Sequence, residues 1–324
     1  MGARTTLTQL LGLQHPVLLA PMAGVSGGHL AAAVSRAGGL GLIGGGYGDG
    51  AWLAEQMALS SGVPFGVGVI TWALREQPEL LQQAIAARPR AVMLSFGAIE
   101  ELAAPVRDAG VVLIAQVQTV QQARQAVAHG AQVVVAQGGE AGGHGGLRGT
   151  MALVPAVVDA VGAVPVVAAG GIADGRGLAA ALVLGAGGAL CGTAFVAATE
   201  SLAPEQAKQR LLQGGGDDTI KSPVFDLARG LHWPAGPWQL RTMRNPFIDR
   251  WEKDLAGLKA SLPDVQRQYN TAQEAGDFDV AATIVGEAAD LVHTVAAAAD
   301  IVRSMVAHCD ALLGQRRVHS SETH

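Results

Sequence analysis

The amino-acid sequence predicts a (β/α)₈ barrel, a fold of eight parallel strands that are each followed by a helix. Short β-branched or Leu-rich runs alternate with Ala-rich amphipathic stretches over residues 17–192, which is the pattern of repeated βα units. Eight such runs favour a closed barrel over an open, doubly wound sheet. Several runs lead directly into glycine-rich turns, where a barrel enzyme places its active site.

The predicted strands follow one another at intervals that leave room for a helix after each of them. They comprise residues 17–20, 39–43, 65–70, 91–96, 111–117, 131–136, 164–169 and 189–192. The segments between them repeat their apolar positions with the period of a helix. The predicted helices include residues 28–37, 51–60, 78–87, 99–108, 120–129 and 175–184.

The character of the chain changes after residue 212. The run GGGDD reads as a linker, and the segment that follows is rich in Pro, Trp and Arg without a βα rhythm. From residue 251 the pattern is helical, with a break at 276–278. We therefore expect a barrel of residues 1–212 plus 287–319, with 287–313 as its last helix, and a smaller, mostly helical cap or substrate domain of residues 213–286. The last five residues, 320–324, are expected to fray.

Composition excludes several classes of function. The net charge of −5, with 22 Lys and Arg residues in 324, gives no basic patch for nucleic acid. The two cysteines, Cys191 and Cys309, lie far apart and outside any metal-binding motif, so we expect no metal site. The long uncharged run 178–198 is interrupted by GAGG and CGT, which favours buried core over a membrane span. We expect a cytoplasmic protein.

The loop after the sixth predicted strand carries the strongest catalytic signal. It reads AQGGEAGGHGG over residues 136–146 and holds one imidazole, His144, and one carboxylate, Glu140. A loop histidine is more often a surface residue, but this one stands at the predicted mouth of the barrel. A neutral imidazole can take a proton from an acidic carbon near neutral pH. For Glu140 we expect a structural role, because carboxylates in such turns accept backbone N–H groups.

Two later turns suggest a phosphate site. AAGGIADG (168–175) follows the seventh predicted strand and CGTAF (191–195) the eighth, where barrels commonly bind phosphate. Backbone N–H groups, a helix N-terminus and the Thr193 hydroxyl can all point to one anion. After the first strand, PMAG places Met22 and Ala23 at the mouth, either beside a ligand or in a simple strand-to-helix turn. No GxxxxGK[ST] motif is present, which excludes a P-loop NTPase.

Together these motifs resemble the FMN-dependent nitronate monooxygenases, formerly called 2-nitropropane dioxygenases. The matching segments are PMAG (21–24), GLGLIGGG (39–46), PFGV (64–67), the His144 loop, AAGGIADG, GTAF (192–195), and the long stretches 225–247 and 276–302. The resemblance implies an FMN-binding barrel with His144 as the catalytic residue. It also implies that the cofactor contacts Met22, Ala23, Gln116, Gln137, Gly138, Gly142, Gly170, Gly171, Gly192 and Thr193.

The sequence departs from the family pattern at two positions. Gly68 stands where related sequences often have Asn, and Gln116 stands where many have Lys. A hydrogen-bond donor and a positive charge near the cofactor are therefore missing. An anionic reduced flavin should be less stable in this protein as a result.

Three functions remain open on this basis. The first is oxidation of alkyl nitronates, and of nitroalkanes, by O₂ to a carbonyl compound and nitrite. The second is NAD(P)H-dependent reduction of a quinone or an enoyl thioester on the same cofactor. The third is non-catalytic binding of FMN or a metabolite. The expected partners are a small-molecule substrate and O₂, and the apolar last helices permit a homodimer.

Overall fold

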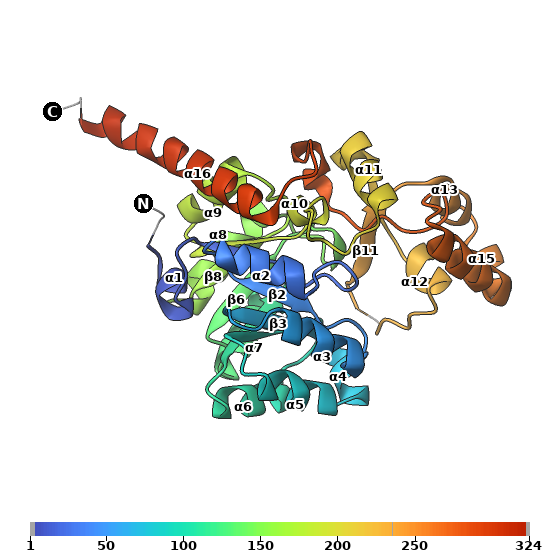
Figure 1. Cartoon of the computed structure of the whole chain (residues 1–324), viewed down its shortest axis with the longest axis horizontal. Coiled ribbons are helices and arrows are strands. Elements are labelled where there is room, and N and C mark those ends of the chain that lie inside the picture. The colour runs from blue at the N-terminus through green and yellow to red at the C-terminus, as the bar shows by residue number, and fades with distance from the viewer. Residues whose placement is uncertain (1–3, 235, 322–324) are drawn as a thin grey trace.

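The computed structural model describes residues 4–234 and 236–321, with side chains up to residue 314. Its centre is a barrel of eight parallel strands in the order β1-β9-β8-β6-β5-β4-β3-β2 (Figure 1). A parallel bridge between Leu18 and Leu40 joins β1 to the chain just before β2 and closes the ring. The barrel strands are β1 (Val17–Leu19), β2 (Gly41–Gly44), β3 (Phe65–Ile70), β4 (Ala91–Ser95), β5 (Val112–Val117), β6 (Val133–Gln137), β8 (Val166–Ala169) and β9 (Gly188–Cys191). The predicted fold is confirmed.

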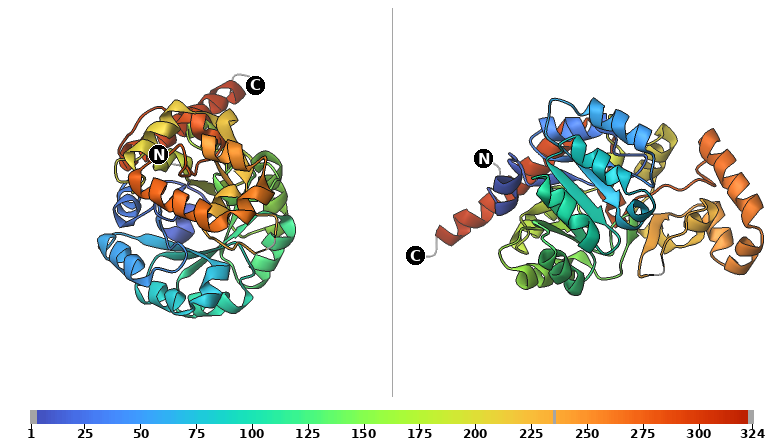
Figure 2. Two further views of the ribbon diagram at one scale, coloured as in Figure 1. Left: turned by 90° about the vertical axis from the view of Figure 1, so that its right-hand side faces the viewer. Right: turned by 90° about the horizontal axis from the view of Figure 1, so that it is seen from below.

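Helices form a ring around the strands, as the left view of Figure 2 shows. Polar side chains begin several of them by accepting free backbone N–H groups: Asp49 caps α3, Asp174 caps α9, and Thr119 forms a capping box with Gln122 at α7. The helices up to residue 213 are α1 (Thr6–Leu11), α2 (Gly28–Arg36), α3 (Gly50–Leu59), α4 (Thr71–Glu76), α5 (Glu79–Ala86), α6 (Glu100–Asp108), α7 (Val120–Ala128), α8 (Thr150–Val161), α9 (Gly175–Val183), α10 (Thr193–Val196) and α11 (Glu205–Gln213).

The core has two layers because side chains alternate along each strand. In β4, Val92 and Leu94 pack in the layer shared with the helices, whereas Met93 packs inside the barrel. Leu7 and Leu11 of α1 join the inner layer. The inner layer is thus filled with apolar side chains, and the open end of the barrel is left for a site.

The cap contains a small sheet that the sequence pattern did not predict. Strand β10 (Thr219–Ser222) pairs antiparallel with β11 (Gln239–Met243), which pairs antiparallel with β7 (Gly143–Gly145) of the His144 loop. The cap projects to one side of the barrel in the right view of Figure 2. Its helical part has an aromatic core of Phe225, Phe247, Trp251 and Tyr269. The cap elements besides the strands are η1 (Gly216–Asp218), α12 (Val224–Ala228), α13 (Pro246–Trp251), α14 (Leu255–Ala260) and α15 (Leu262–Ala275).

The last helix starts later than the predicted 287. Residues Glu287–Leu291 form a 3-10 turn, η2, and α16 spans Ala298–Ser321. The backbone between η2 and α16 forms hydrogen bonds with the segment after α10. Ala296 O accepts from Thr199 N, and the Glu200 carboxylate accepts from Ala298 N. Of the predicted frayed end, 320 and 321 belong to α16 and 322–324 lie outside the described residues. Within the described chain, no helix is long and apolar enough to cross a membrane.

Candidate active site

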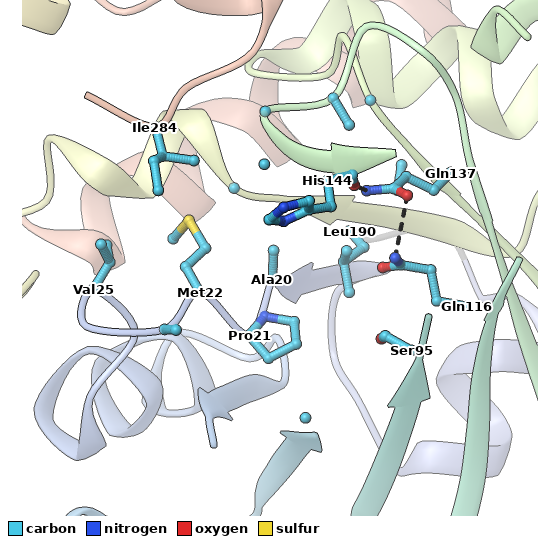
Figure 3. A pocket seen from close by; sticks show the side chains of 18 of the residues that line it. Ala20, Pro21, Met22, Val25, Ser95, Gln116, Gln137, His144, Leu190 and Ile284 are labelled. Atoms are coloured by element: carbon cyan, nitrogen blue, oxygen red, sulfur yellow. Dashed lines mark hydrogen bonds between the residues drawn. The ribbon is translucent and has the colours of Figure 1, made fainter. Parts of the chain in front are cut away.

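A cavity opens at the carboxyl ends of the barrel strands, beneath β11 and the segments around residues 229–233 and 284–288. Its open volume, mouth included, is about 1250 Å³. Figure 3 shows side chains from distant parts of the chain turned toward this space. The cavity is lined by these predicted site residues: Met22, Ala23, Gln116, Gln137, Gly142, His144, Gly170, Gly171, Gly192 and Thr193.

Gly138 is the one predicted site residue outside the cavity lining. A Cβ atom at this position would lie 2.0 Å from Thr150 Oγ1 and 2.5 Å from Glu140 Oε2. Gly138 therefore lets the loop pack closely against the start of α8. Glu140 accepts hydrogen bonds from Thr150 N (2.9 Å) and Thr150 Oγ1 (2.8 Å), which is the structural role expected for this carboxylate.

Contacts to its backbone fix the position of His144. Strand β11 places Leu240 opposite it, and Gln137 Nε2 donates to His144 O at 2.9 Å. The oxygen of the Gln137 amide accepts in turn from Gln116 Nε2 at 3.2 Å and from Gln118 Nε2 at 2.9 Å (Figure 3 draws the former). Gln116 is thus part of a hydrogen-bond network that supports the His144 strand.

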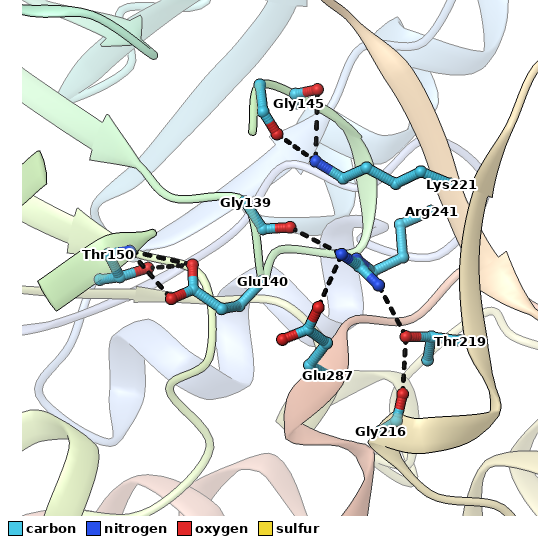
Figure 4. Close-up of polar contacts among 10 residues, drawn as sticks. Gly139, Glu140, Gly145, Thr150, Gly216, Thr219, Lys221, Arg241 and Glu287 are labelled. Carbon is cyan, nitrogen blue, oxygen red and sulfur yellow. Dashed lines mark hydrogen bonds and ion pairs between the residues drawn. The ribbon is translucent and has the colours of Figure 1, made fainter. Parts of the chain in front are cut away.

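Cationic side chains fasten the same loop to the cap (Figure 4). Lys221 of β10 donates to the carbonyl oxygen of Gly146, and Arg241 of β11 donates to Gly139 O at 3.1 Å. Arg241 also forms an ion pair with Glu287 at 2.7 Å. Burial lowers the pKa of Lys221 to about 8. The loop that carries His144 is therefore tied to the cap at both of its ends.

Asp226 is the principal site residue that the sequence did not reveal. Its carboxylate oxygens lie 2.9 and 3.0 Å from His144 Nε2, and both side chains are buried. Asp226 belongs to α12, whose place over the barrel mouth depends on the cap fold. The separation of 82 residues from His144 leaves no spacing signal by which to find this pair.

The imidazole of His144 is neutral at pH 7. Burial lowers its pKa below the usual 6.5, the hydrogen bond and charge of Asp226 oppose this shift, and the positive charge of Arg229 adds to it. In the neutral ring, hydrogen bonding to a carboxylate places the proton on Nε2. Nδ1 then keeps its lone pair, and no described residue forms a hydrogen bond with it.

An aromatic wall stands beside this imidazole. The Trp233 ring stacks on His144 with centroids 3.4 Å apart and planes 16° apart, and Phe96 meets both rings edge-on. Phe96 adopts a left-handed backbone conformation with φ of +63°, which is uncommon for a bulky residue and costs conformational energy. The wall restricts access of water to the imidazole.

The turns after β8 and β9 form a cradle of backbone groups in the same cavity. Gly170 and Gly171 have φ of +101° and +72°, which residues with a Cβ atom rarely adopt. Thr193 begins α10, and its hydroxyl accepts from Gly286 N at 2.9 Å, so the hydroxyl hydrogen can be donated to an anion. Together with Gly192, these residues line the cavity.

The floor of the cavity depends on glycines that allow close backbone approach. A Cβ atom at Gly44 would lie 2.5 Å from the Met22 carbonyl carbon, and one at Gly68 would lie 2.2 Å from Pro21 Cγ. The Pro21 ring therefore occupies the space that an asparagine side chain would need at position 68. Among the described residues, no cluster of three or more His, Cys, Asp or Glu residues could hold a metal ion.

Comparison with known proteins identifies the family of this site. The family model described as "Nitronate monooxygenase" matches residues 4–308. The chain belongs to the nitronate monooxygenase family. This is a family of flavin-dependent oxidoreductases, and the residues present fit such a group: the glycine turns and the hydroxyl hydrogen of Thr193 can receive a phosphate.

Relatives within and around the family carry different names. A nitronate monooxygenase of Paraburkholderia phytofirmans is 33% identical over 350 residues, covering 91% of this chain and 92% of its own. A protein of Mycobacterium tuberculosis named (3aS,4S,5R,7aS)-5-hydroxy-7a-methyl-1-oxo-octahydro-1H-indene-4-carboxyl-CoA dehydrogenase is 38% identical over 70% of this chain, and the match spans 65% of that protein. The structure of FabK from Thermotoga maritima is 30% identical, with a TM-score of 0.85 over 98% of this chain and 99% of its own.

Proposed function

We propose that this protein is an FMN-dependent oxidoreductase that uses O₂ to convert alkyl nitronates, and nitroalkanes, into carbonyl compounds and nitrite. The observation that carries the proposal is a buried, neutral His144 held by Asp226, in the same cavity as the cradle of Gly171, Gly192 and Thr193. This arrangement offers a proton acceptor beside a place for the cofactor. The assay is O₂ uptake together with nitrite release when a nitronate is supplied.

The residues of the cavity would hold the cofactor by its two ends. Gly170, Gly171, Gly192 and Thr193 would bind the single terminal phosphate, which favours FMN, while Met22 and Ala23 would lie along the ring system. The bound flavin would supply the redox chemistry, accepting electrons from the nitronate and passing them to O₂.

The free, buried cysteines Cys191 and Cys309 support the proposal of a cytoplasmic enzyme.

His144 would act at the carbon next to the nitro group. Nδ1 would accept the proton from that carbon, leaving a nitronate anion and an imidazolium whose Nε2–H donates to Asp226. The carboxylate would stabilise the new positive charge and fix the ring orientation. A preformed nitronate has already lost this proton, so it does not require the transfer.

The pH dependence of the two substrates is expected to differ. Because the pKa of His144 is lowered, the neutral, proton-accepting form persists below pH 6.5 and is lost as the pH falls through the lowered value. The kcat/KM for a neutral nitroalkane should therefore show an acid limb below pH 6.5 that is absent with the nitronate. Steady-state rates across pH 4.5–8 would measure this, and a limb centred above pH 6.5 would contradict the assignment.

Replacing Asp226 with asparagine should lower kcat/KM for a neutral nitroalkane by roughly 10²- to 10⁴-fold, with the flavin retained. An amide that donates to Nε2 forces the ring proton onto Nδ1 and removes the base. Nitroalkane turnover by stopped-time assay would show the loss. The control is Asp249→Asn, which removes a half-exposed acid that pairs with Arg244 in the cap. An unchanged rate in Asp226→Asn would mean that Asp226 does not set the tautomer.

A second candidate function is NAD(P)H-dependent reduction of a thioester, which the CoA-thioester dehydrogenase and FabK similarities favour. It uses the same cavity but begins with hydride delivery from a nicotinamide. Steady oxidation of NADH or NADPH with an enoyl thioester, without nitrite formation from any nitronate, would support it over the first.

A further inference from the structure

The imidazole of His144 lies flat against the indole ring of Trp233, with centroids 3.4 Å apart and planes 16° apart. Trp233 makes other ring contacts of a different kind. Within the described part of the chain, these neighbours meet it edge-on, at interplanar angles of 71° to 83°: Tyr47, Trp72, Phe96 and Trp238. Among the ring partners of Trp233, His144 is therefore the one that packs on a face of the indole.

The edge-on neighbours fix the plane of this indole. Phe96 and Trp72 lie closest, with centroids 5.1 and 5.4 Å from that of Trp233. Phe96 keeps its place with a left-handed backbone, φ of +63°, a conformation that persists where the surrounding structure imposes it. Burial raises the pKa of Tyr47, so this neighbour is uncharged at pH 7. The indole is thus held against the imidazole before a substrate arrives.

The stack leaves the proton-accepting atom of His144 open. The lone pair of Nδ1 lies in the plane of the imidazole, whereas Trp233 covers a face of that ring. Nε2 is engaged with the Asp226 carboxylate at 2.9 and 3.0 Å, and both His144 and Trp233 line the cavity. When Nδ1 accepts a proton, the positive charge spreads over the ring that faces the indole.

We propose that Trp233 is a positioning residue for proton transfer, with an indole face that stabilises the imidazolium form of His144. This rests on the proposed function, in which a C–H bond of the substrate breaks and its proton moves to Nδ1. The face of an indole carries negative potential and attracts a cation, and the attraction is stronger where water is excluded. The neutral imidazole gains less from the same contact. The stack therefore favours the form that arises during the reaction.

Charged groups on other elements act on the same imidazole. Asp226 of α12 favours the imidazolium, and Arg229, which follows α12, opposes it. Lys221 and Arg241 of the cap strands donate to carbonyl oxygens of the His144 loop. Burial itself lowers the pKa of His144, so two roles of Trp233 predict opposite results. Loss of a mere barrier to water would raise the pKa toward 6.5, and loss of a stabilising indole face would lower it further.

The test changes the electrons of Trp233 and keeps its shape. Mono-, di- and trifluorinated tryptophan, inserted at position 233 alone, weaken the negative potential of the ring face in steps. NMR titration of carbon-labelled histidine in the FMN-loaded protein measures the pKa, with the His144 signal assigned by its loss in His144→Gln. The pKa should fall with each fluorine, by about half to one pH unit over the series. A constant pKa across the series would overturn the proposal.

Trp233→Leu removes the indole and should lower the pKa of His144 by about one pH unit. The acid limb of kcat/KM for a neutral nitroalkane should move to lower pH by the same amount, while turnover of a preformed nitronate changes less than about threefold. Trp52→Leu is the matched control, because it removes an indole of α3 outside the cavity lining, and it should leave the pKa unchanged.

A pKa that rises toward 6.5 in Trp233→Leu would overturn the proposal and leave Trp233 as a barrier to water. The NMR readout does not depend on turnover. If no nitronate is oxidised but the pKa of His144 falls along the fluorinated series, the oxidase proposal fails and the role of Trp233 at His144 stands.

Discussion

Replacing His144 with alanine is expected to lower kcat/KM for neutral nitroalkanes by roughly 10²- to 10⁴-fold, the usual contribution of a general base, while the protein stays yellow. The imidazole is the buried group whose Nδ1 lone pair is free to accept a proton. Its removal leaves the turns after β8 and β9 untouched, so flavin content should not change. Initial rates of nitrite release, with absorbance as the measure of bound flavin, would establish both points.

The nitronate serves as the internal control for this variant. Since a preformed nitronate needs no deprotonation, its turnover should fall less than about tenfold in His144→Ala. Equal losses on nitroalkane and nitronate would contradict the base and leave His144 as an anion-stabilising or structural residue. His29→Ala, which alters an exposed histidine of α2, should leave both rates at the level of the unmodified enzyme.

The combined change Gly171→Ala and Thr193→Val is expected to give colourless protein. Gly171 has φ of +72°, which costs a residue with a Cβ roughly 1–2 kcal/mol, and the new methyl group would lie 3.4 Å from Glu140 Cβ. Valine at 193 removes the hydroxyl and leaves Gly286 N without its acceptor. Both losses fall on the proposed phosphate cradle, so affinity for the cofactor should drop steeply.

The flavin-to-protein ratio after purification and after incubation with excess FMN measures this effect. Gly110→Ala is the matched control, because Gly110 has φ of +70° with open space around its Cβ position and lies outside the cavity. It tests backbone strain alone and should keep its flavin. One bound flavin per protein in the double variant would mean that the phosphate binds at another site.

Local sequence pattern was enough to predict the barrel. The strand predicted at residues 65–70 is β3 (Phe65–Ile70). A short apolar run between turn residues is typical of a parallel strand that is buried on both faces. The same reasoning placed glycine turns at the carboxyl ends of the strands. Their role at a phosphate is a property of barrel geometry, so Gly171 and Thr193 could be selected without a structure.

The cap could not be predicted in the same way, because its contacts are long-range. Strand β7 consists of Gly143, His144 and Gly145, residues without strand propensity as a set, and it exists because β11 pairs with it. Asp226 and Trp233 reach His144 only after the cap has folded over the mouth. The predicted start of the last helix was wrong for a related reason, since residues 287–291 form a 3-10 turn and hydrogen bonds at Ala296 and Ala298 tie the backbone just before α16 to the segment after α10.

The most direct test of the central claim is an anaerobic absorbance titration of the flavin-loaded protein. Propionate 3-nitronate is added to one sample, and NADH or NADPH to another, with His144→Ala in parallel. The proposed function predicts that the nitronate alone bleaches the flavin absorbance and that O₂ restores it with release of nitrite. Bleaching only by a nicotinamide would contradict nitronate oxidation and support the reductase. A protein that binds no flavin even after reconstitution with FMN would contradict the cofactor assignment itself.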